Sequence, residues 1–156
     1  MAKAFLNLLL IAASALSIPA AFATPLSIGS PPPDFALRSL DDTNLRLSEY
    51  RSEVVVLYFW APWCGKCRDP LESLNSSFMD YRQDGLQVLA VSVDDQIDHV
   101  TEYLSGLNVS FPVLADDERN SVSRSYELGK LPLALLIDRE GNLRYLHEEP
   151  SQEQTT

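Results

Sequence analysis

The stretch from Val54 to Cys67 constrains the fold of this 156-residue chain more than any other. It begins with seven apolar residues, VVVLYFW at 54–60, whose β-branched and aromatic side chains are typical of a buried strand. Beyond this run the apolar positions follow helical spacing, at Leu71, Leu74, Phe78 and Tyr81. The sequence therefore predicts a buried strand that leads into a helix, with Cys64 and Cys67 between them.

The position of these two cysteines predicts a redox dithiol. Free N–H groups and the positive end of the helix dipole lie at a helix N-terminus, where a thiol is more acidic than a free one. The three-residue spacing lets the sulfur of Cys67 reach that of Cys64 across one turn. A purely structural disulfide is the weaker alternative, because a bridge over so short a loop adds little chain-entropy stabilisation.

A zinc site is the other alternative for a CxxC pair, and the residue counts disfavour it. Structural zinc takes four ligands. The chain has no further cysteine and only two histidines, His99 and His147, which are far apart in sequence. We therefore expect no metal and no cofactor besides a redox-active disulfide between Cys64 and Cys67.

The first 23 residues have the pattern of a signal peptide. Lys3 is followed by an apolar stretch over 5–18, and Ala21-Phe22-Ala23 forms a small-residue cleavage signal before Thr24. The alternative is an uncleaved membrane anchor, since about 20 apolar residues can span a bilayer. We expect export to the periplasm, where disulfides persist, and a mature N-terminus at Thr24.

Size and charge restrict what the remaining chain can do. After residues 1–23 it is long enough for one domain with its own core, and it contains no internal repeat. The formal net charge of −10 argues against nucleic acid or an anionic lipid surface as a partner.

Turn signals and hydrophobic spacing divide this domain into an α/β pattern. Phe35 and Leu37 alternate with Leu45 and Leu47 around a DDTN turn, which predicts a hairpin. Apolar runs predict further extended segments over 86–93, 111–114, 133–137 and 143–146. Helical spacing predicts helices over 96–107 and 118–126, the second closed by Gly129 in the C′ position. The result is a mixed sheet with helices on both faces.

Three motifs resemble one protein family. FWAPWCGKC at 59–67 resembles the thioredoxin active-site block, and PDFAL at 33–37 is similar to the entry strand of the same family. GKLP at 129–132, followed by LLIDREG at 135–141, resembles its proline loop, strand and turn. From about Ile28 to Tyr145 the chain is similar to the TlpA/ResA-like thioredoxins of the bacterial envelope, which are related to the AhpC/TSA redoxins.

The resemblance implies a thioredoxin-like three-layer α/β fold over residues 24–146. Its central mixed sheet would be flanked by helices, with an N-terminal hairpin and a central strand–helix insertion. Members of the family usually end in an amphipathic helix that covers one sheet face, whereas residues 147–156 form a polar tail. We therefore expect the C-terminal helix to be missing and one face of the last two strands to be uncovered. Such a chain should be marginally stable alone, bind a hydrophobic dye, or hide the face in a dimer or against a partner.

The resemblance also implies roles for the residues of the redox site. Cys64 would attack the substrate disulfide and Cys67 would resolve the mixed disulfide. Trp63 would form a wall of the site, with Gly65 and Lys66 between the two sulfurs.

The proline loop is the second part of the implied site. The family places a cis peptide bond at Leu131-Pro132, with the proline against the disulfide and the Leu131 backbone pairing with a bound peptide. General frequencies by themselves favour a trans bond. Leu133 stands where the family often has threonine, which implies a more apolar substrate groove.

Two departures from the family concern proton transfer. Tyr58 stands where thioredoxin carries a buried aspartate, and Pro70 where the ResA-like branch places a glutamate. Neither acid is present, so water or Lys66 remain as proton acceptors for Cys67. Pro70 must also kink the helix or be confined to its first turn.

These observations favour an exported thiol–disulfide oxidoreductase that reduces or exchanges protein disulfides in the cell envelope. A membrane electron donor of the DsbD/CcdA type would recharge it, and cytochrome c maturation is one expected context. A peroxidase of the peroxiredoxin type is an alternative because the PDFxL entry is shared, but Ala61 replaces the threonine that such enzymes need. A non-catalytic binding module is the third reading, and the intact WCGKC argues against it.

Overall fold

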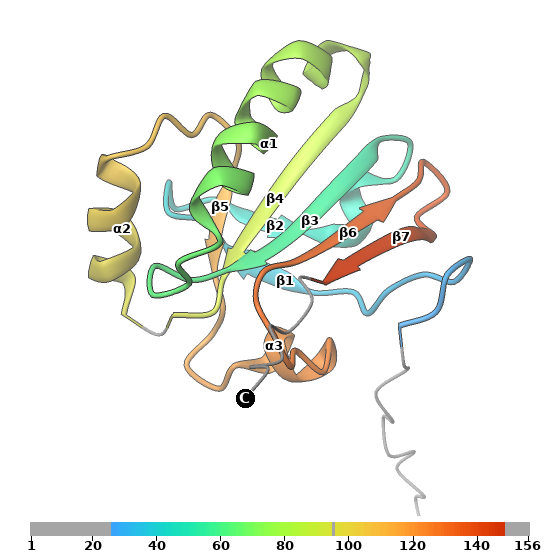
Figure 1. Cartoon of the computed structure of the whole chain (residues 1–156). Helices are drawn as coiled ribbons and strands as arrows, with labels where there is room; N and C mark the ends of the chain where they lie inside the picture. The colour runs from blue at the N-terminus through green and yellow to red at the C-terminus, as the bar shows by residue number, and fades with distance from the viewer. Residues whose placement is uncertain (1–25, 95, 149–156) are drawn as a thin grey trace, which may run out of the picture.

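The computed structural model describes residues 26–94 and 96–148 (Figure 1). The predicted signal peptide and most of the predicted polar tail lie outside these residues. Within the described part of the chain, no helix is long and apolar enough to cross a bilayer.

A five-stranded mixed sheet forms the centre of the domain, with strand order β5-β4-β3-β6-β7, beside a two-stranded sheet β1-β2. Strands β3, β4 and β5 are parallel, whereas β6 and β7 are antiparallel to their neighbours. The strand bounds are β1 Ala36–Arg38, β2 Asn44–Arg46, β3 Val54–Trp60, β4 Leu86–Ser92, β5 Val113–Ala115, β6 Leu133–Ile137 and β7 Leu143–Glu148. The predicted mixed sheet and N-terminal hairpin are thus confirmed.

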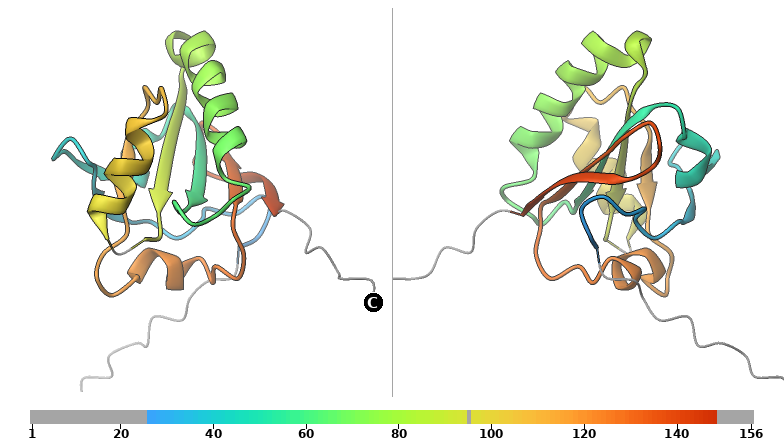
Figure 2. Two further views of the ribbon diagram at one scale, coloured as in Figure 1. Left: turned by 60° about the vertical axis from the view of Figure 1, so that its left-hand side comes forward. Right: turned by 90° about the vertical axis from the view of Figure 1, so that its right-hand side faces the viewer.

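Helices lie on both sides of this sheet, which makes three layers. Helices α1 and α2 cover one face, and the hairpin β1–β2 and α3 lie against the other (Figures 1 and 2). The helix bounds are α1 Arg68–Tyr81, α2 Ile97–Ser105 and α3 Ser121–Ser125, with short 3-10 helices at Leu47–Tyr50 and Arg82–Asp84. The predicted insertion corresponds to α2 and β5.

Alternate side chains of β3 build two separate cores. Leu57 and Phe59 face the hairpin and α3, whereas Tyr58 and Trp60 face α1 and α2. This follows from the period of two along a strand. All four are almost completely buried, as expected for the central strand of a covered sheet.

Helix α3 is shorter than the predicted 118–126 because aspartate side chains hold the preceding segment in a turn. The Asp117 carboxylate accepts hydrogen bonds from the N–H groups of Arg119 and Ser121. Asp116 accepts from the N–H groups of Val122 and Ser123. Such side-chain acceptors compete with the helical hydrogen bonds of the backbone.

The prediction that Gly129 closes this helix is wrong. Glu127 takes the left-handed position, with φ of 49°. Its N–H donates to the Arg124 carbonyl, and the N–H of Leu128 donates to the Ser123 carbonyl. This is the Schellman arrangement, and its left-handed residue lies two positions before the glycine.

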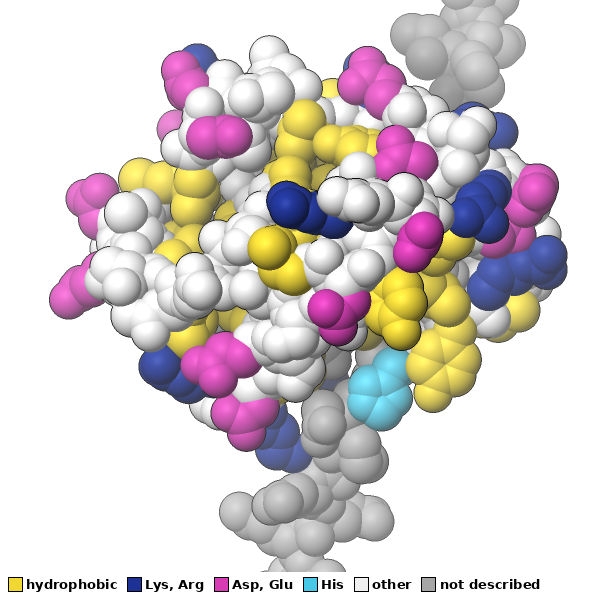
Figure 3. Space-filling view, turned by 90° about the horizontal axis from the view of Figure 1, so that it is seen from above, with side chains coloured by type: hydrophobic (Ala, Val, Ile, Leu, Met, Phe, Trp, Pro, Cys, Tyr) yellow, Lys and Arg dark blue, Asp and Glu magenta, His cyan; other side chains and the backbone are white. Residues whose placement is uncertain are grey.

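The two faces of the β6–β7 pair differ in how well they are covered. On the side of the hairpin, Leu135 and Leu143 are buried. On the side of α1, Leu136 is 37% exposed and Tyr145 is 58% exposed. Figure 3 shows apolar side chains gathered near a histidine at one edge of the molecule. Among the described residues, the predicted partly uncovered face is therefore present.

Candidate functional site

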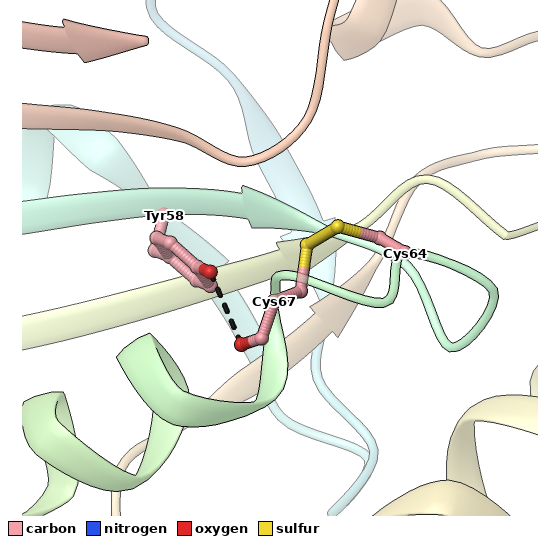
Figure 4. Close-up of a disulfide and its surroundings, with 3 residues drawn as sticks. All are labelled: Tyr58, Cys64 and Cys67. Atoms are coloured by element: carbon pink, nitrogen blue, oxygen red, sulfur yellow. Dashed lines mark hydrogen bonds between the residues drawn. A yellow bond between two sulfur atoms is a disulfide. The ribbon is translucent and has the colours of Figure 1, made fainter. Parts of the chain in front are cut away.

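The two cysteines form a disulfide in the turn between β3 and α1 (Figure 4). The sulfurs are 2.02 Å apart and the two Cα atoms 5.4 Å apart. The N–H of Cys64 donates to the Ala61 carbonyl and the N–H of Cys67 to the Cys64 carbonyl, each at 3.0 Å. Backbone hydrogen bonds thus hold both half-cystines directly after the buried strand.

The prediction that both cysteines lie between the strand and the helix is confirmed. Cys67 is the residue before the first helical turn, which starts at Arg68, and Cys64 lies in the preceding turn. Pro70 agrees with this helix start, because a proline is tolerated in a first helical turn and clashes with the carbonyl of residue i−4 in a helix interior. The expectation that Pro70 is confined to the first turn is confirmed.

The two sulfur-bearing residues differ in accessibility. Cys64 keeps 8% of its surface exposed, whereas Cys67 is completely buried. The backbone of Cys67 is also held from the sheet, because the hydroxyl of Tyr58 donates a hydrogen bond of 3.2 Å to its carbonyl oxygen (Figure 4). Cys67 is therefore the fixed member of the pair and Cys64 the member nearer to solvent.

The residues around the cysteines in sequence form the outer surface of the turn. Trp63 is 68% exposed, which is unusual for so large an apolar ring. Gly65 and Lys66 are also exposed, and a side chain at Gly65 would meet no atom within 4 Å. The turn thus presents an open surface around Cys64.

The proline loop also contacts the region of the disulfide, although it lies far from the cysteines in sequence. Leu131-Pro132 is a cis peptide bond, in agreement with the family resemblance. Leu131 packs against the buried cluster that contains both cysteines. Pro132 is buried, and with Tyr58 and Pro70 it lines a cavity between α1 and β6 of about 240 Å³.

This cavity includes residues that the sequence analysis did not assign to the site. His147, at the end of β7, lies at its edge, and its ring stacks on that of Tyr145 with a centroid distance of 6.4 Å. Tyr58 was noted only as a replacement for an acid. The pairing of Ala134 with His147 across β6 and β7 decides this position, and such register is not visible in one strand alone.

A second, more polar pocket of about 330 Å³ lies beside Trp63. It is lined by Trp63, Val93, Asp94, Gln96, His99 and Asn120. Because β3 and β4 are parallel, with Trp60 opposite Ser92, the segments that follow them meet at the same sheet edge. Sites of open α/β sheets usually form at the carboxyl ends of strands, and Asp94 follows the end of β4, which is the sequence signal for its position.

The described residues contain no group of three or more His, Cys, Asp or Glu side chains placed to hold a metal ion. His99 and His147 belong to the two different pockets. The chemically distinctive feature of the site is therefore the disulfide itself.

Comparison with known proteins agrees with this geometry. The model of the AhpC/TSA family matches residues 28–146. The chain belongs to the AhpC/TSA family. Relatives that match it over most of its length include proteins named as thiol–disulfide oxidoreductases.

Two of these relatives are ResA proteins. The thiol–disulfide oxidoreductase ResA of Geobacillus thermodenitrificans is 34% identical over 140 residues, which are 88% of this chain and 80% of the relative. ResA of Bacillus subtilis is 31% identical over 118 residues, which are 76% of this chain and 65% of the relative.

Solved structures are similar over the same region. A crystal structure from Chlorobium tepidum, assigned as a thiol:disulfide interchange protein DsbE, has a TM-score of 0.73 and 34% identity over 78% of this chain and 85% of that one. The thioredoxin domain of an oxidoreductase from Bacteroides vulgatus has a TM-score of 0.74 at 20% identity, over 80% and 91% of the chains, which shows the fold. The chain thus has the thioredoxin-like fold and is a thiol–disulfide oxidoreductase of the ResA and DsbE type.

Proposed function

We propose that this enzyme transfers two electrons to protein disulfides through Cys64 and Cys67, with Cys64 as the attacking thiol. The observation that carries the assignment is the difference in burial, because only Cys64 reaches the surface while Cys67 is enclosed. Trp63, Gly65 and Lys66 would form the outer surface that a substrate meets. Leu131 and Pro132 would form the facing loop.

The exchange proceeds in two balanced steps. The Cys64 thiolate attacks one sulfur of the substrate disulfide, forms a mixed disulfide and releases the other substrate sulfur as a thiolate. The Cys67 thiolate then attacks the Cys64 sulfur, which closes the Cys64–Cys67 disulfide and releases the second substrate thiolate. The substrate is reduced and the enzyme oxidised by two electrons, and the structure corresponds to the oxidised form.

We propose further that the enzyme works outside the cytoplasm. The signal-like residues 1–23 support export, and residues 24–146 would be the mature thioredoxin-like domain. A membrane electron donor of the DsbD/CcdA type would regenerate the dithiol, with cytochrome c maturation as the proposed context. The resemblance to envelope thioredoxins supports this. Mass spectrometry of the exported protein should find Thr24 as the first residue, and retention of residues 1–23 would instead favour a membrane anchor.

Cysteine variants test the catalytic assignment. Cys64→Ser should abolish the reduction of insulin disulfides, whereas Cys67→Ser should accumulate a mixed disulfide that a reductant releases. Exposed Ser76→Ala on α1 is the matched control and should retain wild-type turnover. Stronger alkylation of Cys67 than of Cys64 in the reduced protein at neutral pH would reverse the roles.

The same assay separates the alternatives. A wild-type protein that reduces hydrogen peroxide rapidly and insulin poorly would be a peroxidase. A wild-type protein that binds unfolded polypeptide and reduces neither would be a binding module.

A further inference from the structure

The polar pocket beside Trp63 has no role in the exchange steps, although it adjoins the residue that precedes the attacking cysteine. Asp94 and Trp63 both line it, and Asp94 is only 7% exposed whereas Trp63 is 68% exposed. A buried carboxylate beside an exposed aromatic ring is an arrangement suited to a cation.

The charges of the pocket come from two side chains. Among the described residues that line it, only Asp94 and His99 can be titrated, and Gln96 and Asn120 are neutral. The N–H of Gln96 donates to Oδ1 of Asp94 at 2.8 Å, and Nδ1 of His99 lies 3.8 Å from the same oxygen. With a neutral imidazole the pocket therefore carries one negative charge.

Among the described residues, other charges near the active-site turn do not line this pocket. Arg68 pairs with Glu72 at 3.3 Å and donates to the Gly106 carbonyl at 3.3 Å. Lys66 is exposed on the turn itself. Asp94 is therefore the described carboxylate that lines the pocket together with Trp63.

We propose that this pocket binds a lysine or arginine side chain that lies next to the target disulfide of the substrate polypeptide. This inference rests on the proposed function, because it places the basic side chain beside a substrate sulfur that Cys64 attacks. The Asp94 carboxylate supplies the counter-charge, and the Trp63 ring covers the alkyl or guanidinium part of the side chain.

His99 lies against the same carboxylate, with its Nδ1 3.8 Å from Oδ1 of Asp94. Its ring helps to hold the carboxylate in the pocket. Asp94 acts as the specificity residue and takes no part in electron transfer.

Matched peptides test the proposal. Each peptide carries one intramolecular disulfide and differs at one position beside a cysteine, which is Lys, Gln or Glu. The dithiol form of the full chain is mixed with each peptide, and the second-order rate constant of the single turnover is measured. The readout is the ratio of this constant for the Lys peptide to that for the Glu peptide. We expect a ratio of about fivefold at low salt, the size of one weak ion pair with a cation–π contact.

Three variants test whether the ratio of the rates with Lys and Glu peptides depends on the pocket. Asp94→Asn should bring it close to one, and the asparagine oxygen can still accept the Gln96 N–H that Asp94 accepts now. Glu102→Gln, on an exposed position of α2 outside the pocket, removes the same charge and should retain the ratio. His99→Gln should also retain the ratio, because the counter-charge is the Asp94 carboxylate.

The use of a ratio within one variant keeps the result independent of partial misfolding. An equal rate for Lys and Glu peptides in the wild type, or an unchanged ratio in Asp94→Asn, would overturn the pocket assignment while leaving the proposed function intact. Failure of the wild type to reduce any peptide would overturn the proposed function, and this inference with it.

Discussion

The two faces of the central sheet differ in how completely other parts of the chain cover them. The face toward the hairpin and α3 holds a continuous core in which Leu57, Phe59 and Leu135 are completely buried. The face toward α1 and α2 holds the disulfide, but it remains partly open over β6 and β7, where Leu136 and Tyr145 are exposed. Beneath α1 and α2 the second face is also closely packed, since Trp60 and Leu71 are completely buried. The two faces therefore differ in closure over β6 and β7, and we expect buried side chains there to contribute more stability on the closed face than on the open one.

Two neighbouring leucines on β6 give the largest expected difference between the faces in the free energy of unfolding. Leu135 is completely buried on the closed face, and Leu136 is 37% exposed on the open face. Leu135→Ala should lower the free energy of unfolding by about 2–5 kcal/mol, because it leaves a cavity in a packed core. Leu136→Ala should lower it by less than about 1 kcal/mol. Urea denaturation of both variants measures the difference, and equal losses would show that the two faces contribute alike.

Two buried tyrosines, one on each face of the sheet, allow the faces to be compared through a single hydrogen bond each. Tyr58 donates to the Cys67 carbonyl on the open face, and Tyr126 donates to the Pro33 carbonyl at 2.7 Å on the closed face. Burial raises the pKa of Tyr126 well above its ordinary value, so its hydroxyl remains a donor at alkaline pH. Each Tyr→Phe change should remove roughly 1 kcal/mol of stability.

Only one of these tyrosine variants should affect the chemistry. Tyr58→Phe releases the backbone of Cys67 and should alter the reduction potential and the alkylation rate of Cys64. Tyr126→Phe is its control and should leave both unchanged. Identical redox properties in the two variants would show that the hydrogen bond to Cys67 is purely structural.

A pH titration tests the polar edge of the closed face. Burial alone would raise the pKa of Asp34, but hydrogen bonds from Ser48 and Arg46 outweigh it and hold this pKa below the ordinary value. A lowered pKa stabilises the fold above the ordinary carboxyl range, and this stabilisation is lost as the pH falls through the folded-state pKa. Because the side chain is 43% exposed, Asp34→Asn should lose only about 0.5–1 kcal/mol at pH 7.

The loss in Asp34→Asn should shrink below about pH 4, where the wild-type carboxyl is also protonated. Urea denaturation at several pH values measures it. A loss that stays constant down to about pH 2 would mean that the hydrogen-bond geometry, and not the charge, stabilises this edge.

The smallest expected effect on stability concerns the open face itself. Replacing Leu136 and Tyr145 together by Gln should change the free energy of unfolding by less than about 0.5 kcal/mol, because both side chains already contact water. The same double variant should bind less of a hydrophobic dye than the wild type. Equal dye fluorescence in the two proteins would place the dye elsewhere on the molecule.

Much of the fold was predictable because its signals are local. The alternation of β3 side chains, the helical spacing of α1 and the DDTN turn each act within a few residues, and the strands and hairpin were found from them. Helix ends were less predictable. The start of α1 depends on how Pro70 is accommodated, and the end of α3 on a left-handed Glu127 where a glycine was expected.

The residues of the site also divide into those that were predictable from the sequence and those that were not. Cys64 and Cys67, and by resemblance Leu131-Pro132, were recognisable because their chemistry is carried by residue type and spacing. Asp94 and His99 beside Trp63, and His147 beside Tyr58, were not. Their proximity depends on the pairing of β3 with β4 and of β6 with β7. Sequence by itself determined which residues can react, and the tertiary structure decided which residues surround them, because strand pairing joins segments whose separation along the chain carries no local signal.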